Sequence, residues 1–355
     1  MFGAFLRTYF SRRLDLESGF SGDYYDPTQL EGFARQKAER LKAVGLVDFP
    51  AIVHLETLAH CNAACNFCPY PTLERKGARM SDALIAKVIY DLADIPKDVY
   101  FQFAPYKVSE PFLESRLFDI LAMANDKLPN ASISLITNGS PLTEKKIRQL
   151  GDVKNLAYIN VSMNFDNPEE YEAVMQLPFA RTIERLEGLH RLHAEGVIRC
   201  PVRLTRVASN RNDDLSFKQW VGSNFPRFSP AIAPRHDWIG TIDDPAGVAA
   251  VPDTPCHRWF DMSITATGVV SMCCMDGDAH YPKGGRQYAA CTRDLQPAMA
   301  TRIAPDTGQP SHYAQSLQSL YVFELLSRRS AGARLRRLVQ HARHRQRELG
   351  NDGVE

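Results

Sequence analysis

Three cysteines stand close together in the stretch Ala51–Tyr70, which reads AIVHLETLAHCNAACNFCPY. Cys61, Cys65 and Cys68 have the spacing C-x3-C-x2-C, and Phe67 precedes the third cysteine. Three thiolates on one short loop can ligate three irons of a [4Fe–4S] cluster. The fourth iron would then have no protein ligand and would stay open to another molecule.

Two other interpretations of these cysteines are weaker. A structural zinc ion takes four ligands, and only three cysteines are clustered. His60 would be a fourth ligand next to Cys61, but adjacent residues rarely bind one ion together. Buried structural thiols would need no fixed spacing. The strand expected just before the loop, with Phe67 in place, favours the cluster.

This motif resembles the radical S-adenosylmethionine (radical SAM) superfamily. In that superfamily the open iron binds the amino and carboxylate groups of S-adenosylmethionine (SAM). The resemblance implies a cluster on Cys61, Cys65 and Cys68, and a bound SAM that is cleaved reductively. The products would be methionine and a 5′-deoxyadenosyl radical, which abstracts hydrogen from a substrate. A flavodoxin- or ferredoxin-type protein would donate the electron.

Strand and helix signals alternate from about residue 46 onward. Strands are expected at Ile52–Glu56, Val99–Phe103, Ser132–Thr137, Tyr158–Met163, Val202–Val207 and Ala231–Pro234. Helices are expected at Ser81–Leu92, Ser115–Lys127, Leu142–Leu150, Glu169–Met175, Ala180–Glu195 and Phe217–Ser223. Repeated βα units predict an α/β fold, a partial (β/α)6 barrel of the TIM type. Six units are also what the radical SAM superfamily usually has.

Functional residues of such barrels follow the carboxyl ends of strands. The superfamily has a Gly-Glu-Pro motif after its second strand, and this chain has Ser109, Glu110 and Pro111 there. The resemblance implies that Glu110 binds the SAM amino group. It also implies that Ser162 contacts the SAM ribose or carboxylate, and that Arg181 pairs with the carboxylate, a task that suits a guanidinium fork.

Further SAM contacts are expected from residues beside these positions, namely Phe67, Asn138 and Asn164. Each position also has an ordinary explanation. Asn138 and Gly139 form a common turn dipeptide, Ser162 can satisfy a strand end, and Arg181 can be a solvated helix residue.

A second cysteine group begins at Cys256 and has the spacing C-x11-G-x4-C, ending at Cys273. Strands at Ser263–Thr265 and Val269–Cys273 around Thr267-Gly268 predict a β-hairpin. This arrangement resembles the auxiliary-cluster domains called SPASM and Twitch. It implies one auxiliary iron–sulfur cluster with Cys256, Cys273 and Cys291 as ligands. A hairpin that keeps no cluster is the alternative.

The chain is expected to have four parts. These are a helical N-terminal extension (1–45), the radical SAM core barrel (46–236), a SPASM/Twitch-like β-hairpin-plus-helix domain (237–327) and a basic C-terminal helix or tail (328–355). The tail has eight arginines and no acidic residue between Arg328 and Arg347. It is either the solvated side of a docked amphipathic helix or a surface for an acidic partner. No aromatic residues are interleaved, so nucleic acid is not favoured.

We expect a tailoring oxidoreductase that acts on a small molecule, such as a sugar or amino-sugar, or on a peptide. Asp237, with His236 and Asp276 as further candidates, is expected to accept a proton in an oxidation. Cys274 neighbours Cys273 and points to the opposite face of a strand, so it could return hydrogen in an epimerisation. The alternative function is a non-catalytic iron–sulfur or zinc scaffold or sensor whose basic tail contacts nucleic acid.

The composition is that of a globular protein. The chain has 355 residues, 44% of them hydrophobic and 23% charged, with a net charge of +1. No apolar run reaches the roughly 18–20 residues that span a bilayer. The first residues do not form a convincing signal peptide because Arg7 interrupts the apolar run. Eight cysteines with three tightly spaced favour metal chemistry in a reducing compartment. The cytoplasm is therefore the expected location.

Overall fold

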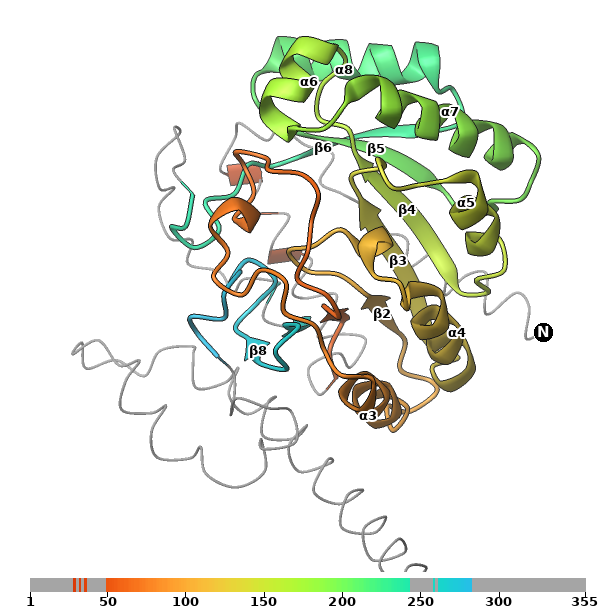
Figure 1. Ribbon diagram of the computed structural model, residues 1–355, viewed down its shortest axis with the longest axis vertical. Helices are drawn as coiled ribbons and strands as arrows, with labels where there is room; N and C mark the ends of the chain where they lie inside the picture. Colours follow the sequence, from red (N-terminus) through yellow and green to blue (C-terminus); the bar gives the residue numbers. More distant parts are fainter. Residues whose placement is uncertain are drawn as a thin grey trace, which may run out of the picture. The chain divides into compact units, whose positions relative to one another are not determined.

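A computed structural model describes residues 28, 29, 32, 35, 36, 49–242, 258 and 261–282. Among these residues one sheet runs through the protein, with the strand order β6-β5-β4-β3-β2-β1-β7-β8 (Figure 1). The strands are β1 (Ile52–Leu55), β2 (Phe101–Ala104), β3 (Ala131–Thr137), β4 (Leu156–Ser162), β5 (Val202–Val207), β6 (Ser229–Ala233), β7 (Asp261–Ile264) and β8 (Val270–Ser271). All neighbouring pairs are parallel except β7 and β8.

Helices connect the parallel strands. They are α3 (Asp82–Leu92), α4 (Leu117–Lys127), α5 (Glu144–Leu150), α6 (Pro168–Met175), α7 (Phe179–Ala194) and α8 (Arg211–Asn224), with short 3-10 turns η1 (Tyr70–Thr72) and η2 (Pro111–Leu113). Figure 1 shows α3, α4, α5 and α7 along the same side of the curved sheet. Six sequential parallel strands confirm the predicted partial barrel. It is an open sheet, because the described strand order ends at β6 and β8.

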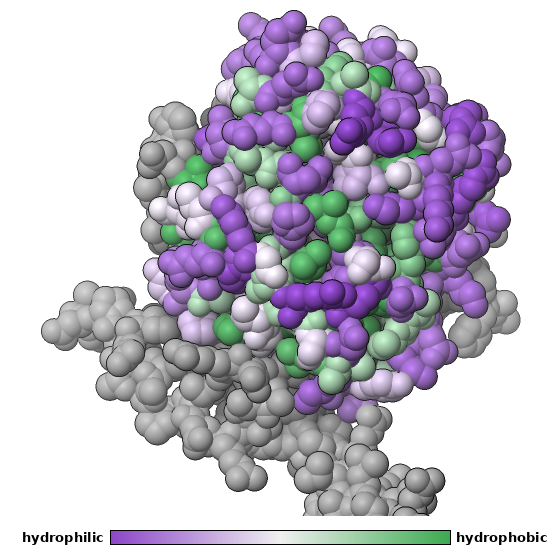
Figure 2. Space-filling view, viewed as in Figure 1, coloured by the Kyte–Doolittle hydropathy of each residue, from purple (hydrophilic) through white to green (hydrophobic). Residues whose placement is uncertain are grey.

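The main core lies between this sheet and its helices. Alternation along β1 sends Val53 and Leu55 into the core, where both are fully buried. His54 therefore faces the other side of the sheet. Figure 2 shows mainly hydrophilic side chains on one outer face. Within the described residues, the exposed large apolar side chains are the scattered Tyr90, Leu215, Ile239 and Tyr281.

Capping residues explain where several helices begin. The Ser81 side chain accepts a hydrogen bond from Leu84 N and caps α3, which therefore begins within one residue of the predicted Ser81–Leu92. The prediction that the last barrel helix begins at Phe217 was wrong. α8 begins six residues earlier, at Arg211, because the Asn210 side chain caps it by accepting from the backbone N–H groups of Asn212 and Asp213.

The predicted hairpin is present as β7 and β8, which pair through Ser263↔Ser271 and Ile264↔Val270. Gly268 has a φ of +81° in the turn, and a Cβ there would lie 2.9 Å from Leu84 Cδ2, so the turn requires glycine. β7 also pairs in parallel with β1. The hairpin thus extends the sheet of the barrel.

Several predicted segments lie outside the described residues. They include Cys256, Cys291, the helix expected within the 237–327 domain and the basic tail from residue 328. Before residue 49, the described residues 28, 29, 32, 35 and 36 are helical. No helix in the described part of the chain is long and apolar enough to cross a bilayer.

Candidate active site

The loop with the three leading cysteines follows the carboxyl end of β1. His60 O accepts a hydrogen bond from Glu110 N at 2.8 Å, and His60 Nδ1 lies 3.1 Å from the Tyr70 hydroxyl. The Phe67 carbonyl accepts from Trp238 Nε1 at 2.9 Å. Contacts from three other segments therefore hold the loop in one conformation, as a cluster-binding loop requires.

The chemistry of the three thiols fits an iron–sulfur cluster. None of them forms a disulfide. Burial raises the pKa of Cys61 to about 12 and of Cys68 to about 11, and it raises that of Cys65 further still. The Cys61 and Cys68 sulfurs are near enough to add to the rise at Cys65. Thiolates gathered in this place need a positive centre to stabilise them, and a metal cluster supplies one.

Two of the thiols have polar neighbours that could tune such a cluster. Cys61 Sγ accepts from Ala63 N at 3.4 Å and from Asn138 Nδ2 at 3.8 Å. Cys65 Sγ lies 3.3 Å from the sulfur of Met175 in α6. Hydrogen bonds to the sulfurs adjust the reduction potential of a cluster. The Met175 contact was not predicted, because an apolar residue on a helix carries no sequence signal for such a role.

Glu110 joins the end of β3 to the cysteine loop. Its carboxylate is buried and accepts from Thr137 Oγ1 and Asn138 N, both at 2.7 Å, and from Phe112 N at 3.1 Å. The Asn138 side chain then reaches Cys61. The predicted residues Glu110, Asn138 and Cys61 are thus brought together. Most of the acceptor capacity of Glu110 is used within the protein.

The buried Glu110 carboxyl should make stability depend on pH. Burial raises its pKa from 4.5 to about 7. Between these values the folded state binds more protons than the unfolded state, so the free energy of unfolding falls as pH rises. Between pH 4.5 and about pH 7, the free energy of unfolding should therefore fall by about 3 kcal/mol.

Denaturant unfolding of the wild type and Glu110→Gln at pH 4.5, 6 and 7.5 measures this effect. Glutamine does not titrate, so the difference in unfolding free energy between the two proteins should shift by that amount across the window. His54, whose pKa is lowered to about 4 by burial, contributes with the opposite sign and cancels in the difference. An unchanged difference would show that the pKa of Glu110 is the same in the folded and unfolded states.

Ser162 and Asn164 lie at and just after the end of β4. Ser162 is half-buried and pairs in register with Thr205 of β5. Asn164 is buried in the left-handed conformation, with a φ of 62°. Its Oδ1 accepts from Val207 N at 2.9 Å, and its Nδ2 donates to Met175 Sδ at 3.3 Å. Asn164 therefore links the ends of β4 and β5 to Met175, the residue whose sulfur contacts Cys65 Sγ.

The remaining predicted residues of the core are not drawn into this network. Arg181 is exposed on the first turn of α7, and it forms no ion pair with any other described residue. The Asp237 carboxylate accepts from Ile239 N and Gly240 N, both at 3.1 Å. These bonds stabilise a turn in which Trp238 and Ile239 have positive φ. Asp237 thus has a structural role alongside the predicted catalytic one.

The described part of the second cysteine group is a compact loop after β8. Cys273 is buried, and its carbonyl accepts from Lys107 Nζ at 3.3 Å. The buried Asp276 carboxylate accepts from the backbone N–H groups of Met272, His280 and Tyr281. Burial lowers the pKa of Lys107 to about 8. The three hydrogen bonds to Asp276 hold the loop in one conformation. The other predicted cluster ligands, Cys256 and Cys291, lie outside the described residues.

One buried ion pair beside the site was not predicted. Glu56 follows β1, is fully buried and pairs with the guanidinium of Arg75. The same carboxylate accepts from Val108 N at 3.1 Å and Ala266 N at 3.0 Å, and Arg75 donates to Gly277 O at 2.7 Å. The pair joins β1, the segment after the cysteines and the hairpin. The sequence feature that could have indicated this ion pair is the alternation of polar and apolar residues along the first strand.

Comparison with known proteins identifies the class of this site. Residues 55–208, less than half of the chain, match the sequence profile of the Radical SAM superfamily, and this region contains the cysteine loop and the strands β2 to β5. This matched region is what the chain shares with the radical SAM superfamily.

Individual relatives are distant. The S-adenosyl-L-methionine-dependent 2-deoxy-scyllo-inosamine dehydrogenase of Niallia circulans is 26% identical over 106 residues, which are 29% of this chain and 41% of the relative. The chain thus matches less than half the length of that enzyme. Streptococcus suis SuiB bound to its precursor peptide SuiA superposes with a TM-score of 0.53 at 12% identity, over 78% of this chain and 69% of SuiB. Another structure, anSMEcpe with bound AdoMet, gives 0.50 at 12% identity, over 67% and 78%. At this low sequence identity, these superpositions show a shared fold and nothing further.

Proposed function

We propose that this protein is a radical SAM oxidoreductase that tailors a small molecule or a peptide. The observation that supports it most directly is the set of three clustered, free thiols at the end of β1, within a matched radical SAM region. Cys61, Cys65 and Cys68 would hold the cluster, which, with a flavodoxin- or ferredoxin-type electron donor, would supply the reductive cleavage of SAM that hydrogen abstraction from the substrate requires.

The chain's own residues bind and orient these groups. Cys61, Cys65 and Cys68 hold the cluster. Glu110 positions Asn138 through the 2.7 Å bond to its backbone N–H, and Asn138 contacts Cys61. Ser162 and Arg181 are proposed to bind SAM. The substrate radical would then either pass one electron to the proposed auxiliary cluster and a proton to Asp237, giving oxidation, or take a hydrogen atom from a cysteine thiol at the same carbon, giving epimerisation.

We propose a polyhydroxylated small molecule of the sugar or amino-sugar type as the preferred substrate. The face of the sheet opposite the helices carries polar side chains, including Gln102, Tyr158, Asn160 and Thr205. Gln102 Nε2 donates to the Tyr158 hydroxyl at 2.9 Å, and Thr205 donates to Asn160. Such a face offers hydrogen bonds to hydroxyl and amino groups. The partial match to an inosamine dehydrogenase supports the same class.

We keep one auxiliary iron–sulfur cluster on Cys256, Cys273 and Cys291 as part of the proposal. The four predicted sequence parts, including a SPASM/Twitch-like segment at 237–327, also remain proposals. The β7–β8 hairpin, which the same resemblance implied, supports this part of the proposal. Counting iron in the wild type and in a variant without the first cluster distinguishes one cluster from two.

The activity is tested by anaerobic reconstitution with iron and sulfide, reduction with dithionite and addition of SAM. The expected result is 5′-deoxyadenosine and methionine in equal amounts, measured by liquid chromatography and mass spectrometry. Zinc without iron, and no 5′-deoxyadenosine, would favour the scaffold or sensor instead. Addition of candidate amino-sugars and peptides should accelerate product formation only for the true substrate class.

The role of Arg181 predicts a specific loss of SAM affinity. Replacing an arginine that pairs with a carboxylate removes about 1.5 kcal/mol or more of binding energy. Arg181→Met should therefore raise the Kd for SAM about tenfold. Isothermal titration of the reconstituted protein measures this, with the exposed Arg199→Met as a control that should bind SAM normally. Equal affinities in both variants would remove Arg181 from the SAM site.

A further inference from the structure

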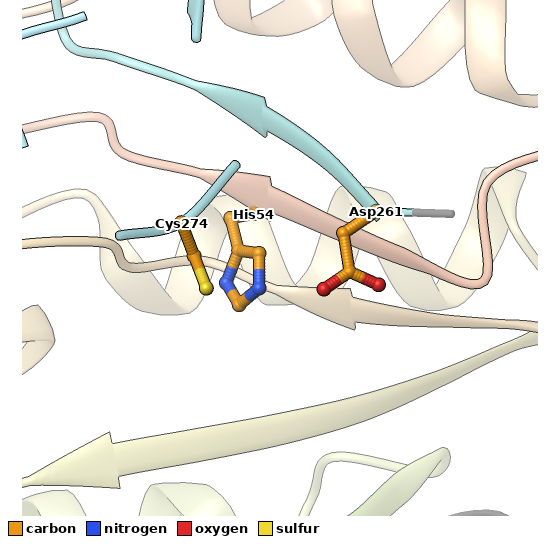
Figure 3. Close-up of side chains that lie close together, drawn as sticks. All are labelled: His54, Asp261 and Cys274. Atoms are coloured by element: carbon orange, nitrogen blue, oxygen red, sulfur yellow. The ribbon is translucent and has the colours of Figure 1, made fainter. Parts of the chain in front are cut away.

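Three metal-binding side chains meet on the face of the sheet opposite the main helices. His54 comes from β1, Asp261 from β7 and Cys274 from the loop after β8 (Figure 3). One ligand atom from each lies within 4.8 Å of the other two. These residues are separate from the cysteine triad of the first loop. Two of them, His54 and Asp261, carried no role in the sequence analysis.

His54 is the residue that points to a missing ligand. It is only 6% exposed, yet neither of its ring nitrogens has a hydrogen-bond partner in the described part of the chain. Its ring meets Tyr106 edge-on, with centroids 5.9 Å apart. Buried imidazole nitrogens are normally satisfied, so two unsatisfied ones require an explanation.

The other two groups are held in place. Asp261 is 6% exposed, and its Oδ2 lies 3.6 Å from Arg258 Nη1 in an ion pair that orients the carboxylate. Cys274 follows Cys273, whose carbonyl is bound by Lys107. Lys107 also donates to Ser271 Oγ at 2.9 Å, so it anchors the loop on both sides of its bend. Ser263 pairs in register with His54 and adds another buried hydroxyl that has no hydrogen bond among the described residues.

We propose that His54, Asp261 and Cys274 form a binding site for a single divalent transition-metal ion of the zinc type. Nitrogen, oxygen and sulfur are the donors that zinc uses, at about 2.0–2.3 Å from the ion. Tetrahedral bonds of that length place the ligand atoms closer together than 4.8 Å, so only a small contraction is needed. The thiolate and the carboxylate would balance the charge of the ion.

A single ion fits better than an auxiliary cluster at these three residues. Ligands of an iron–sulfur cube bind different corners and are spread over the whole cube, whereas these atoms converge on one point. A simple hydrogen-bonded Cys–His pair fits less well, because neither nitrogen of His54 has a partner. With three protein ligands, the fourth position of a tetrahedral ion would be open to water or to a hydroxyl of a substrate.

The test uses the full-length, untagged protein with Cys61, Cys65 and Cys68 replaced by alanine, so that the first cluster does not contribute. Zn²⁺ alone and Co²⁺ alone are the probes. We expect one equivalent of zinc by mass spectrometry. The cobalt form should show a thiolate-to-cobalt charge-transfer band and tetrahedral d–d bands. His54→Ala or Cys274→Ala should weaken zinc binding roughly a hundredfold or more, since even supporting residues of metal sites cost 10–100-fold.

The matched control is Cys273→Ala, which removes the neighbouring thiol and should leave both the zinc affinity and the cobalt spectrum intact. A second readout needs no change within the site. In the Cys273→Ala background, zinc should protect Cys274 from alkylation, as measured by peptide mass spectrometry. The proposal is overturned if cobalt gives no thiolate band, if the band depends on Cys273 instead, or if the protein binds iron and sulfide at Cys274.

Discussion

Replacing Cys61, Cys65 and Cys68 together with alanine is expected to abolish 5′-deoxyadenosine formation, down to the level of a protein-free control. The physical reason is that these residues are the cysteines of the loop after β1, so the variant has no thiolate there to bind the cluster irons. Without the cluster no electron reaches the sulfonium of SAM, whose C–S bond is otherwise stable. The measurement is anaerobic turnover with dithionite, followed by chromatography, with iron counted in parallel.

Cys200→Ala is the matched control for this experiment. Cys200 is also a buried free thiol, but it precedes β5 at the opposite end of the parallel strands. This variant should keep its iron and its activity. If the triple variant still produced 5′-deoxyadenosine at the wild-type rate, the cluster would have to reside elsewhere and the proposed function would be wrong.

Arg75→Met should be among the most destabilising single changes in the described chain. Arg75 and Glu56 have side chains only 8% and 0% exposed, so neither charge is well solvated. Removing the arginine leaves the Glu56 carboxylate buried without its cation, which typically costs about 3–5 kcal/mol. Denaturant unfolding should therefore show a lower midpoint with an unchanged slope.

A double variant separates the loss of the ion pair from the cost of leaving the Glu56 carboxylate buried without a cation. Glu56→Gln combined with Arg75→Met removes both charges, so it should be more stable than Arg75→Met alone. Arg148→Met is the surface control, because Arg148 pairs with Glu144 where both side chains are about half exposed. That change should cost no more than about 1 kcal/mol. A similar cost for Arg75→Met and Arg148→Met would show that the buried pair is solvated in solution.

Local sequence signals predicted most elements of the fold. The alternation of Val202–Val207 matched β5 at both ends, because one face of this strand is buried and the other is not. The start of α8 was missed because its first turns are polar and show little periodicity, although Asn210 followed by Asp213 and Asp214 is a good N-terminal signal. The pairing of β7 with β1 carries no local signal, since periodicity indicates a strand but not its neighbour.

In the site, too, local sequence signals predicted some residues, whereas contacts that depend on strand pairing were missed. Cys61, Cys65 and Cys68 lie within eight positions, so their spacing alone predicted their common role. The link from Glu110 through Asn138 to Cys61 was expected only as a shared location at strand ends. His54 and Asp261 meet because two distant strands pair, and no spacing in the sequence indicates that.

The parallel pairing of β7 with β1 has a consequence for how the protein is made. Ile52 of β1 lies opposite Asp261, about 200 residues later in the chain. During synthesis, β1 therefore has no partner strand on this side until β7 has left the ribosome. The cysteine loop that follows β1 is made long before that point. Contacts of such long range slow folding and leave edges open to aggregation. Cluster insertion after translation of residue 264, or a chaperone that covers β1 until then, would protect the nascent chain.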